Sequence, residues 1–380
     1  MPKDIEGRFP VPTGRPVVVK AGSSSLVLES GALDPDGLDR AVDHVAGLWD
    51  AGHPALLVSS GAVAAGLPAL GLTGRPRDVP GLQAAAAVGQ GLLMERYAAM
   101  FQDRGRVVGQ VLITKDLLAN RAQYLNARNA LERMLTLGVV PIVNENDTVV
   151  VDELRLGGND ELAAIVSHLV SAGLLVILTD TGGIYSGDPR IMDDVELLSA
   201  VDSLDVALDY LAGGDPGPFG VGGVGTKVLA ARMAAWSGIP TVIADARESQ
   251  VVARAVAGES VGTWVSPHPA RLPARKLWIA FGLPVQGRLT VDQGATTALL
   301  DGGKSLLAVG ITSVDGEFEA DGAVEVAGPD NSVIGKGLVA MTSGEVRASI
   351  GRHSSEVGVV VHRDDLVMLA VGGSVDRLAR

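Results

Sequence analysis

The sequence predicts an α/β domain with a mainly parallel sheet, followed by a small all-β barrel. From Pro16 onward, apolar runs rich in β-branched residues alternate with longer alanine-rich segments of helical period, which is typical of a parallel sheet. Three prolines interrupt Ser266 to Arg275, and the β-type runs after them are short and separated by glycines. A chain of 380 residues also exceeds the usual size of a single hydrophobic core, which favours two domains.

The clearest strands of the first domain are short apolar runs. They are expected at Pro16 to Lys20, Ala55 to Ser59, Val107 to Thr114, Val139 to Asn144, Leu174 to Thr179 and Pro240 to Ala244. Longer segments of helical period lie between them and predict helices at Gly81 to Phe101, Arg121 to Leu137 and Asp160 to Ser171.

The prolines of Ser266 to Arg275 prevent a continuous helix, so we expect an extended linker there. This linker separates the two predicted domains. The expected organisation is a flexible N-terminal tail (1–15), a large α/β domain (16–265), the linker (266–275), a small β domain (276–363) and a C-terminal tail (364–380).

The charge and composition exclude several classes of protein. A net charge of −13 argues against a chain that mainly grips nucleic acid, because phosphate contacts need an excess of Lys and Arg. The chain has no cysteine, and its six histidines lack the paired spacing of a metal site, so no protein-held metal is expected. The first residues lack the apolar stretch of a signal peptide, and the longest apolar run, Leu169 to Leu178, is too short to cross a bilayer. We therefore expect a cytoplasmic protein.

Polar residues follow the ends of the predicted strands, where ligands bind in an open parallel sheet. Lys20 precedes Ala21, Gly22 and three serines, a turn whose backbone N–H groups and lysine ammonium could face phosphate oxygens. Taken alone, these residues favour a solvent-exposed lysine at a strand end with serines that cap a helix. The segment Asn144 to Asp147 favours a functional role, since four side chains that compete for backbone hydrogen bonds exceed what a turn needs.

Two further pairs of polar residues each have two interpretations. Ser59 and Ser60 follow a strand and precede an alanine-rich helix, so a helix N-cap and a ligand contact both fit them. Asn159 and Asp160 directly precede an apolar helical segment and are open to the same two interpretations. The sequence by itself does not choose between them.

A glycine-rich segment, FGVGGVGTK from Phe219 to Lys227, precedes another predicted helix. Gly220, Gly222 and Gly225 match the dinucleotide-binding pattern GxGxxG, but that pattern must follow a strand directly, and the preceding GGDPGP cannot form one. The order Thr-Lys also differs from the Gly-Lys-Ser/Thr of a P-loop. The segment therefore predicts a loop that delivers Lys227 to a helix N-terminus, where an anion is favoured.

Together, these segments resemble the amino acid kinase family and, within it, the glutamate 5-kinases. The resemblance covers nearly the whole chain and rests on VVVKAGSSSL, LLVSSGAVAAG, AAAAVGQGLLMERY, GQVLIT, YLNARN, PIVNENDTV, LTDTGGIYSGDPR and GVGGVGTK, in this order. NEND, YLNARN and the TD-to-DPR segment distinguish it from aspartokinases, uridylate kinases and acetylglutamate kinases. The downstream barrel resembles the PUA domain that many glutamate 5-kinases carry.

The resemblance implies a three-layer αβα sandwich around an eight-stranded, mainly parallel sheet. It also implies phosphorylation of the γ-carboxylate of L-glutamate by ATP with Mg²⁺, the first step of proline biosynthesis, with feedback inhibition by proline. A homodimer or homotetramer is expected from the family. No membrane partner is expected, and a nucleic-acid partner is disfavoured by the charge.

The family's site residues are carried over at matching motif positions. The phosphate-binding lysine falls on Lys20 and the transition-state lysine on Lys227. Glutamate contacts fall on Ser60, Asp147 and Asn159, with Asn144 and Asp160 lining the same pocket. Nucleotide contacts fall on Lys20, Thr179 and Asp180 and on the loop Val221, Gly222, Gly223, Val224, Gly225, Thr226 and Lys227.

Two positions depart from the family pattern. The family usually has an aspartate before its Asn-Asp pair, where this chain has Gly158, and its loop usually contains GTGGM, where Val221 and Val224 stand here. We expect Asp147 and Asp160 to hold the α-ammonium group of the substrate in place of the missing carboxylate. An aspartate at position 158 should lower the KM for glutamate, provided that Gly158 is not held at positive φ.

Two other functions remain consistent with the sequence. One is a sibling kinase that acts on another carboxylate or on a nucleotide. The other is an RNA-binding regulator, because PUA domains usually accompany RNA modification enzymes. From Lys276 onward, nine Lys and Arg stand against thirteen Asp and Glu, which disfavours binding to RNA phosphates.

Overall fold

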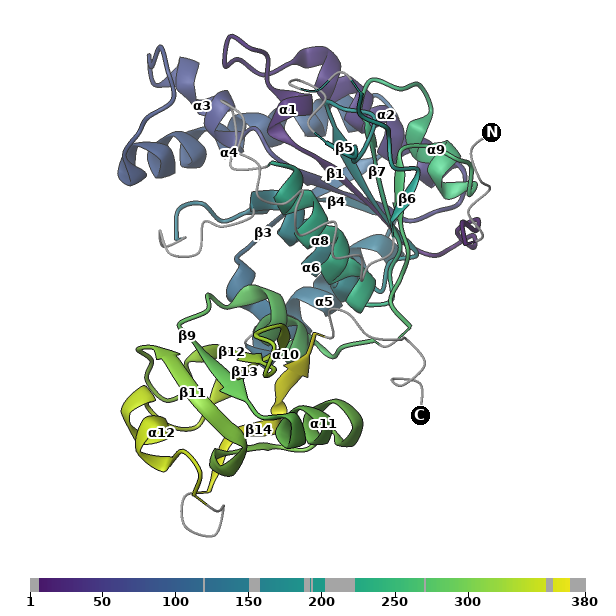
Figure 1. The fold of residues 1–380 in the computed structure, drawn as a ribbon. Helices are drawn as coiled ribbons and strands as arrows, with labels where there is room; N and C mark the ends of the chain where they lie inside the picture. The colour runs from purple at the N-terminus through teal and green to yellow at the C-terminus, as the bar shows by residue number, and fades with distance from the viewer. Residues whose placement is uncertain are drawn as a thin grey trace. The chain divides into compact units, whose positions relative to one another are not determined.

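The computed structural model describes residues 7–118, 120–149, 158–187, 192, 194–201, 223–269, 271–352 and 358–369, and the chain divides into two compact units between Arg271 and Leu272. The first unit contains an eight-stranded sheet with strand order β3-β4-β2-β1-β5-β7-β8-β6 (Figure 1). Every neighbouring pair is parallel except β7 and β8, which confirms the predicted mainly parallel sheet. The strands are β1 (Val17–Ala21), β2 (Ala55–Ser59), β3 (Val107–Ile113), β4 (Val139–Glu145), β5 (Leu174–Thr179), β6 (Ala200–Val201), β7 (Thr241–Asp245) and β8 (Thr263–Val265).

Helices cover both faces of this sheet (Figure 1). On one face, α2 (Pro35–Asp50), α4 (Val79–Gln102) and α9 (Val251–Val256) share a hydrophobic core with alternate residues of β1, including Val17 and Val19. On the other face lie α5 (Arg121–Thr136), α6 (Gly158–Leu169) and α8 (Val224–Trp236). Because both faces are covered, β1, β2 and β5 are buried at every position, which explains their unbroken apolar sequences.

The remaining short elements of the first unit follow strand ends. These are α1 (Ser23–Leu26) after β1, α3 (Ala62–Ala69) after β2 and the 3-10 turn η1 (Lys115–Leu118) after β3. Beneath α3, the backbone of α4 comes so close that a Cβ on Gly89 would lie 1.8 Å from the carbonyl oxygen of Ala62. Only glycine at this crossing allows the two helices to pack at that distance.

From Arg8 onward, the N-terminal residues pack against other parts of the first unit. A flexible tail was expected for residues 1–15. The Arg8 guanidinium donates to the carbonyl oxygens of Ser199 and Val261, and burial lowers its pKa. Val11 is buried, and its amide donates to the carbonyl oxygen of Val256. These partners lie far along the chain, so the short segment itself carries no pattern that would predict them.

The second unit contains a six-stranded sheet with order β10-β14-β13-β12-β9-β11 around its own hydrophobic core. Its strands are β9 (Gly287–Val291), β10 (Leu306–Leu307), β11 (Ile311–Gly316), β12 (Ala323–Ala327), β13 (Val333–Val339) and β14 (Val359–Met368). β14 therefore extends into the segment predicted as a C-terminal tail from residue 364.

The second unit also contains short helices that the all-β prediction lacks. They are α10 (Ala274–Leu277), the π-turn η3 (Trp278–Gly282), α11 (Gln293–Gly302), the 3-10 turn η4 (Ala308–Gly310) and α12 (Ser343–Ser349). Capping explains two of them: Asp292 accepts from the amide of Ala295, and Thr342 forms a capping box with Glu345. Among the described helices of the chain, none combines the length and the apolar content needed to span a bilayer.

Candidate active site

The predicted site residues come together because four strands end side by side at one edge of the sheet. The order β4-β2-β1-β5 places Asn144, Ser59, Lys20 and Thr179 along this edge, although their order in the sequence is different. Lys20 pairs in register with Val58 of β2 and Ile177 of β5, so it stands at the centre of the row. Two helices, α6 and α8, add side chains from their first turns.

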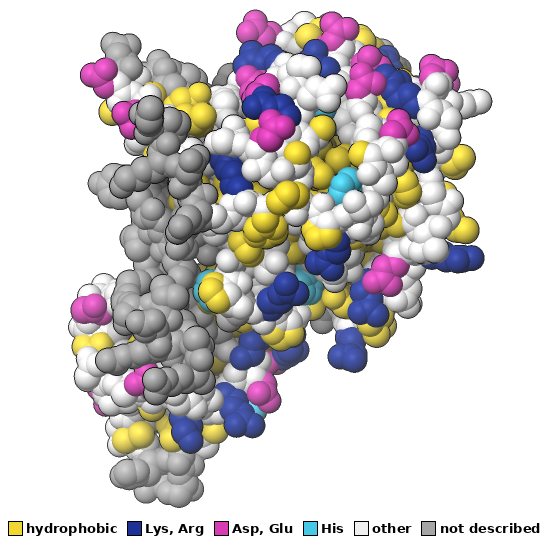
Figure 2. Space-filling model, turned by 90° about the vertical axis from the view of Figure 1, so that its right-hand side faces the viewer, with side chains coloured by type: hydrophobic (Ala, Val, Ile, Leu, Met, Phe, Trp, Pro, Cys, Tyr) yellow, Lys and Arg dark blue, Asp and Glu magenta, His cyan; other side chains and the backbone are white. Residues whose placement is uncertain are grey.

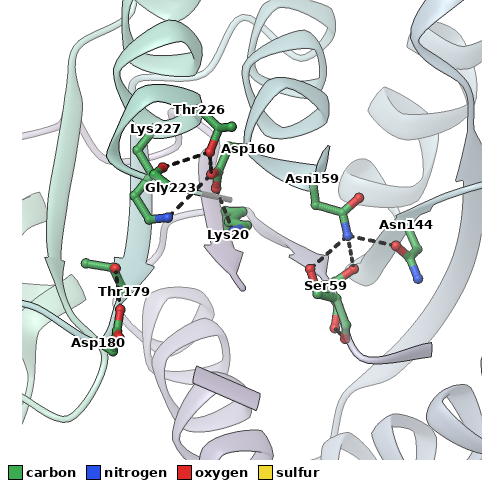
Figure 3. Close-up of polar contacts among 11 residues, drawn as sticks. Lys20, Ser59, Asn144, Asn159, Asp160, Thr179, Asp180, Gly223, Thr226 and Lys227 are labelled. Atoms are coloured by element: carbon green, nitrogen blue, oxygen red, sulfur yellow. Dashed lines mark hydrogen bonds and ion pairs between the residues drawn. The ribbon is translucent and has the colours of Figure 1, made fainter. Parts of the chain in front are cut away.

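A buried ionic cluster lies at the centre of this edge (Figure 3). Lys20 Nζ lies 2.6 Å from Asp160 Oδ1, and Lys227 Nζ lies 3.6 Å from Asp160 Oδ2. The Thr226 hydroxyl donates to Asp160 Oδ2 at 2.7 Å. Lys20 and Asp160 are only 5% and 1% exposed. A solvent-exposed Lys20, one of the two interpretations of the sequence, is therefore ruled out.

Burial and charge act in opposite directions on the two ends of the ion pair. Burial lowers the pKa of Lys20, and neighbouring Lys227 adds to this effect, while Asp160 opposes both. Burial alone would raise the pKa of Asp160, but Lys20 and Lys227 together hold it below its usual value. The carboxylate thus stays ionised and keeps two ammonium groups close to one another in a buried site.

A second polar group lies on the other side of Asp160 and is built around Asn159. Asn159 Nδ2 shares its two protons among three acceptors: the carbonyl oxygen of Ser59 at 2.8 Å, the hydroxyl oxygen of Ser60 at 3.0 Å and Asn144 Oδ1 at 2.9 Å (Figure 3). Successive residues of α6 thus serve different sides of the site: Asn159 contacts the ends of β2 and β4, and Asp160 contacts β1 and α8. Both side chains bond to other strands and helices rather than to the first turn of α6 itself. This supports a ligand-binding role for Asn159 and Asp160 over a role as helix N-caps.

The remaining predicted residues flank these two groups. Thr179 ends β5, is buried, and donates its hydroxyl proton to Asp180 Oδ1 at 3.1 Å. Asp147 is half-buried in the turn after β4. Of the predicted glycine loop, Gly223 is the N-cap of α8 and Val224, Gly225, Thr226 and Lys227 form its first turn, whereas Val221 and Gly222 lie outside the described residues.

One residue of the site, Gln90, was not singled out in the sequence. It lies on α4, is 8% exposed, and its Oε1 accepts from Asn144 Nδ2 at 2.8 Å. Gln90 shares the inward face of α4 with Ala86, Leu93 and Tyr97. A glutamine at a helical spacing that is otherwise apolar is the feature that could have identified it.

Gly158, the first residue of α6, has a positive φ of 56°. An aspartate at this position was expected to lower the KM for glutamate only if φ were not positive, and that condition is not met. A Cβ at this position would meet no atom of the described residues within 4 Å, so among these residues only the backbone conformation resists substitution. Asp and Asn tolerate this conformation better than most residues, at a cost of about 1–2 kcal/mol.

We expect Gly158→Asp and Gly158→Asn to lower the melting temperature by similar amounts, because both pay the same backbone cost. Relative to the Asn variant, the Asp variant should have a KM for an amino-acid acceptor roughly 2- to 5-fold lower, as for a partly exposed ion pair. Measuring KM and melting temperature on both variants separates charge from strain. Equal KM values would show that the ammonium group gains nothing from a carboxylate at this position.

Known proteins resemble this chain over nearly its whole length. The amino acid kinase family model matches residues 15–245, and the PUA domain model matches residues 287–361. The chain is 43% identical to the glutamate 5-kinase of Pelobacter propionicus over 362 residues, which is 93% of this chain and 97% of that protein. It is 42% identical to the glutamate 5-kinase of Moorella thermoacetica over 373 residues (96% and 99%). It is 45% identical to that of Stutzerimonas stutzeri over 361 residues (93% and 97%).

Proposed function

This chain belongs to the amino acid kinase family, and from that membership we propose how its site phosphorylates the γ-carboxylate of L-glutamate, giving L-glutamyl 5-phosphate and ADP. The observation that carries the proposal is the row of strand ends. Polar amide and hydroxyl groups stand on the β4–β2 side, two lysines stand at the centre, and Thr179 stands on the β5 side. This order matches the positions that an acceptor substrate, a phosphoryl group in transfer and a nucleotide would occupy along the edge of the sheet.

The chemistry requires charge and alignment rather than a protein nucleophile. The γ-carboxylate is already ionised at neutral pH, so no general base is needed. One of its oxygens bonds to the γ-phosphorus while the bond to the bridging oxygen breaks, and ADP leaves with that electron pair. Lys20 and Lys227 would balance the negative charge of the phosphoryl group as it moves between the two substrates. Asp160 would hold both ammonium groups in place.

The individual site residues are assigned on the same basis. For glutamate we propose Ser60, Asn144, Asp147 and Asn159, and for ATP we propose Thr179, Asp180 and the loop that ends in Thr226 and Lys227. Asp160, which the resemblance placed beside the substrate ammonium, is better suited to organising the lysines, because both carboxylate oxygens face them or Thr226. Mg²⁺ would enter with ATP, because it is held largely through substrate phosphates.

The function is tested by coupling ADP release to substrate addition. With ATP and Mg²⁺ present, L-glutamate should stimulate ADP release, while aspartate, acetylglutamate and uridylate should not. Hydroxylamine should trap the acyl phosphate product as a hydroxamate. Stimulation by another acceptor with no response to glutamate would assign the chain to a sibling kinase.

Regulation and location follow from the same function. We propose inhibition by proline, the product of the pathway, a homo-oligomeric assembly, and a cytoplasmic location where ATP and glutamate are available. Adding proline to the assay tests the first, and light scattering tests the second. RNA binding is disfavoured because Asp and Glu side chains lie among the Lys and Arg side chains on the face shown in Figure 2. Ion pairs such as those of Arg104 with Asp39 and Asp43 also neutralise surface arginines.

A chain that ends after Arg271 is expected to fold and phosphorylate glutamate, because all the site residues lie in the first unit. Ending it at Pro267 instead should lower its melting temperature. That cut removes His268, which is buried, stacks on Trp236 of α8 at 3.8 Å between ring centroids, and donates its backbone N–H to Ala235. Such a stack is worth about 0.5–1.5 kcal/mol. Equal melting temperatures for the two truncations would contradict this, and a folded but inactive 1–271 chain would implicate the second unit in catalysis.

A further inference from the structure

Three side-chain amides form a continuous row from α4 through the end of β4 to α6. Gln90 Oε1 accepts from Asn144 Nδ2 at 2.8 Å, and Asn144 Oδ1 accepts from Asn159 Nδ2 at 2.9 Å. Asn144 and Gln90 are only 3% and 8% exposed, so water does not compete for these bonds. The amide of Gln90 therefore contacts the acceptor side of the site through Asn144.

Two backbone groups fix which way the side-chain amides of this row point. The Glu145 amide donates to Asn144 Oδ1 at 2.9 Å, and the carbonyl oxygen of Ser59 accepts from Asn159 Nδ2 at 2.8 Å. A backbone N–H only donates and a backbone carbonyl only accepts, so neither asparagine can be turned over without losing a bond. Asn144 must then present its NH₂ group to α4, where the oxygen of Gln90 receives it.

The fixed direction leaves one buried atom at each end of the row of amides, Asn159 Oδ1 and Gln90 Nε2, with no hydrogen-bond partner among the residues that the structure describes. An unpaired buried polar atom costs stability and is retained mainly where function uses it. Asn159 Oδ1 is an acceptor, so its partner must be a donor. Among the groups of glutamate at neutral pH, only the α-ammonium donates, since both carboxylates are ionised acceptors.

Building on the glutamate kinase function, we propose that Gln90 is a positioning residue for the acceptor substrate. Gln90 adds its bond to the backbone bond that orients Asn144, and Asn144 together with the Ser59 carbonyl holds Asn159 so that Asn159 presents its Oδ1 to the substrate α-ammonium. An Asn159 turned the other way would present its NH₂ group to that cation, and the two groups would repel one another. Gln90 thus contributes to selecting an amino acid over a plain dicarboxylic acid without touching the substrate.

The test replaces Gln90 with methionine, which has a similar length and volume but no strong acceptor. Gln90→Met should raise the KM for glutamate about 10-fold, the lower end for a lost charge-assisted hydrogen bond, with kcat and the KM for ATP within about 2-fold of the unmodified chain. Glutarate, which lacks the α-amino group, serves as a competing ligand. Its inhibition constant should not change, because it makes no ammonium contact.

Two variants control for folding and for general effects of α4. Tyr97→Phe removes another buried hydrogen bond of the same helix, between the Tyr97 hydroxyl and Ser59 Oγ at 2.7 Å, which lies outside the row of amides. It should leave the KM for glutamate unchanged. Gln90→Glu retains an oxygen that accepts from Asn144, so its KM should stay within about 3-fold of the unmodified value.

Specific results would overturn the inference. These are a normal KM for glutamate in Gln90→Met, an equal loss of glutarate affinity, or a KM in Gln90→Glu as high as in Gln90→Met. If Gln90→Met folds poorly, Gln90→Glu is compared with the unmodified chain instead, and a KM for glutamate raised well beyond 3-fold overturns the inference. If the unmodified chain does not phosphorylate glutamate at all, the proposed function fails instead, and that is evident before any variant is made.

Discussion

Lys227→Ala is expected to lower turnover about 10²- to 10³-fold, while ATP binding weakens far less. Lys227 lies in the first turn of α8, is buried, and approaches the same carboxylate as Lys20. Its charge matters most when the phosphoryl group is between donor and acceptor, so the loss should appear in kcat rather than in substrate binding. Steady-state kinetics with both substrates varied, together with a direct ATP-binding measurement, gives the comparison.

Lys227→Arg provides the matched control because it keeps the positive charge but alters the shape of the cationic group. Its turnover should fall between that of the alanine variant and that of the unmodified chain. Near-normal turnover in a folded Lys227→Ala protein would remove this lysine from the mechanism. A loss of ATP binding as large as the loss of turnover would instead assign it to nucleotide binding.

Asp160→Asn is expected to have the largest effect on stability, on the order of 3 kcal/mol or more, because it removes the anion from a buried ion pair and leaves cations behind. Asp160 is buried and lies within 4 Å of both lysines. The matched control is Asp245→Asn, the same substitution at the end of β7. There the partner, Arg247, is mostly exposed, so about 1 kcal/mol at most should be lost. Chemical denaturation of both variants gives the two values.

The destabilisation of Asp160→Asn should diminish as pH rises. Burial already lowers the pKa of Lys20 below 10.5, and Asp160 is a group that raises it, so the variant should have a still lower pKa there. Between that pKa and 10.5, the unfolded chain binds more protons than the folded one, and stability therefore increases with pH. The difference in stability between the variant and the unmodified chain should therefore narrow as the pH rises from neutral toward 10.5. A gap that is constant over this range would mean that Lys20 is not the source of the destabilisation.

The sheet was predictable because buried parallel strands are apolar at every position. β2 and β5 have the predicted bounds, and the bounds of β1, β3, β4 and β7 are shifted by one residue at one or both ends. The short strands β6 and β8 were not predicted, because runs of two and three residues carry too little pattern. The helices α11 and α12 were missed for a related reason, since Gly, Ser and Thr within them weaken the helical pattern.

The sequence by itself determined which residue types stand at the strand ends, since each follows an apolar run directly, and it identified the lysines, Asn144, Asn159 and Asp160 as candidates. Only the tertiary structure decided their partners. The strand order places β2 and β1 between β4 and β5, and the first turn of α6 directs Asn159 and Asp160 to different sides. The positive φ of Gly158 and the inward orientation of Gln90 likewise depend on neighbours distant in sequence. Local sequence patterns specify elements through short-range sterics and burial, whereas the pairing of side chains depends on how those elements pack, and for that reason the site could be listed but not assembled from the sequence.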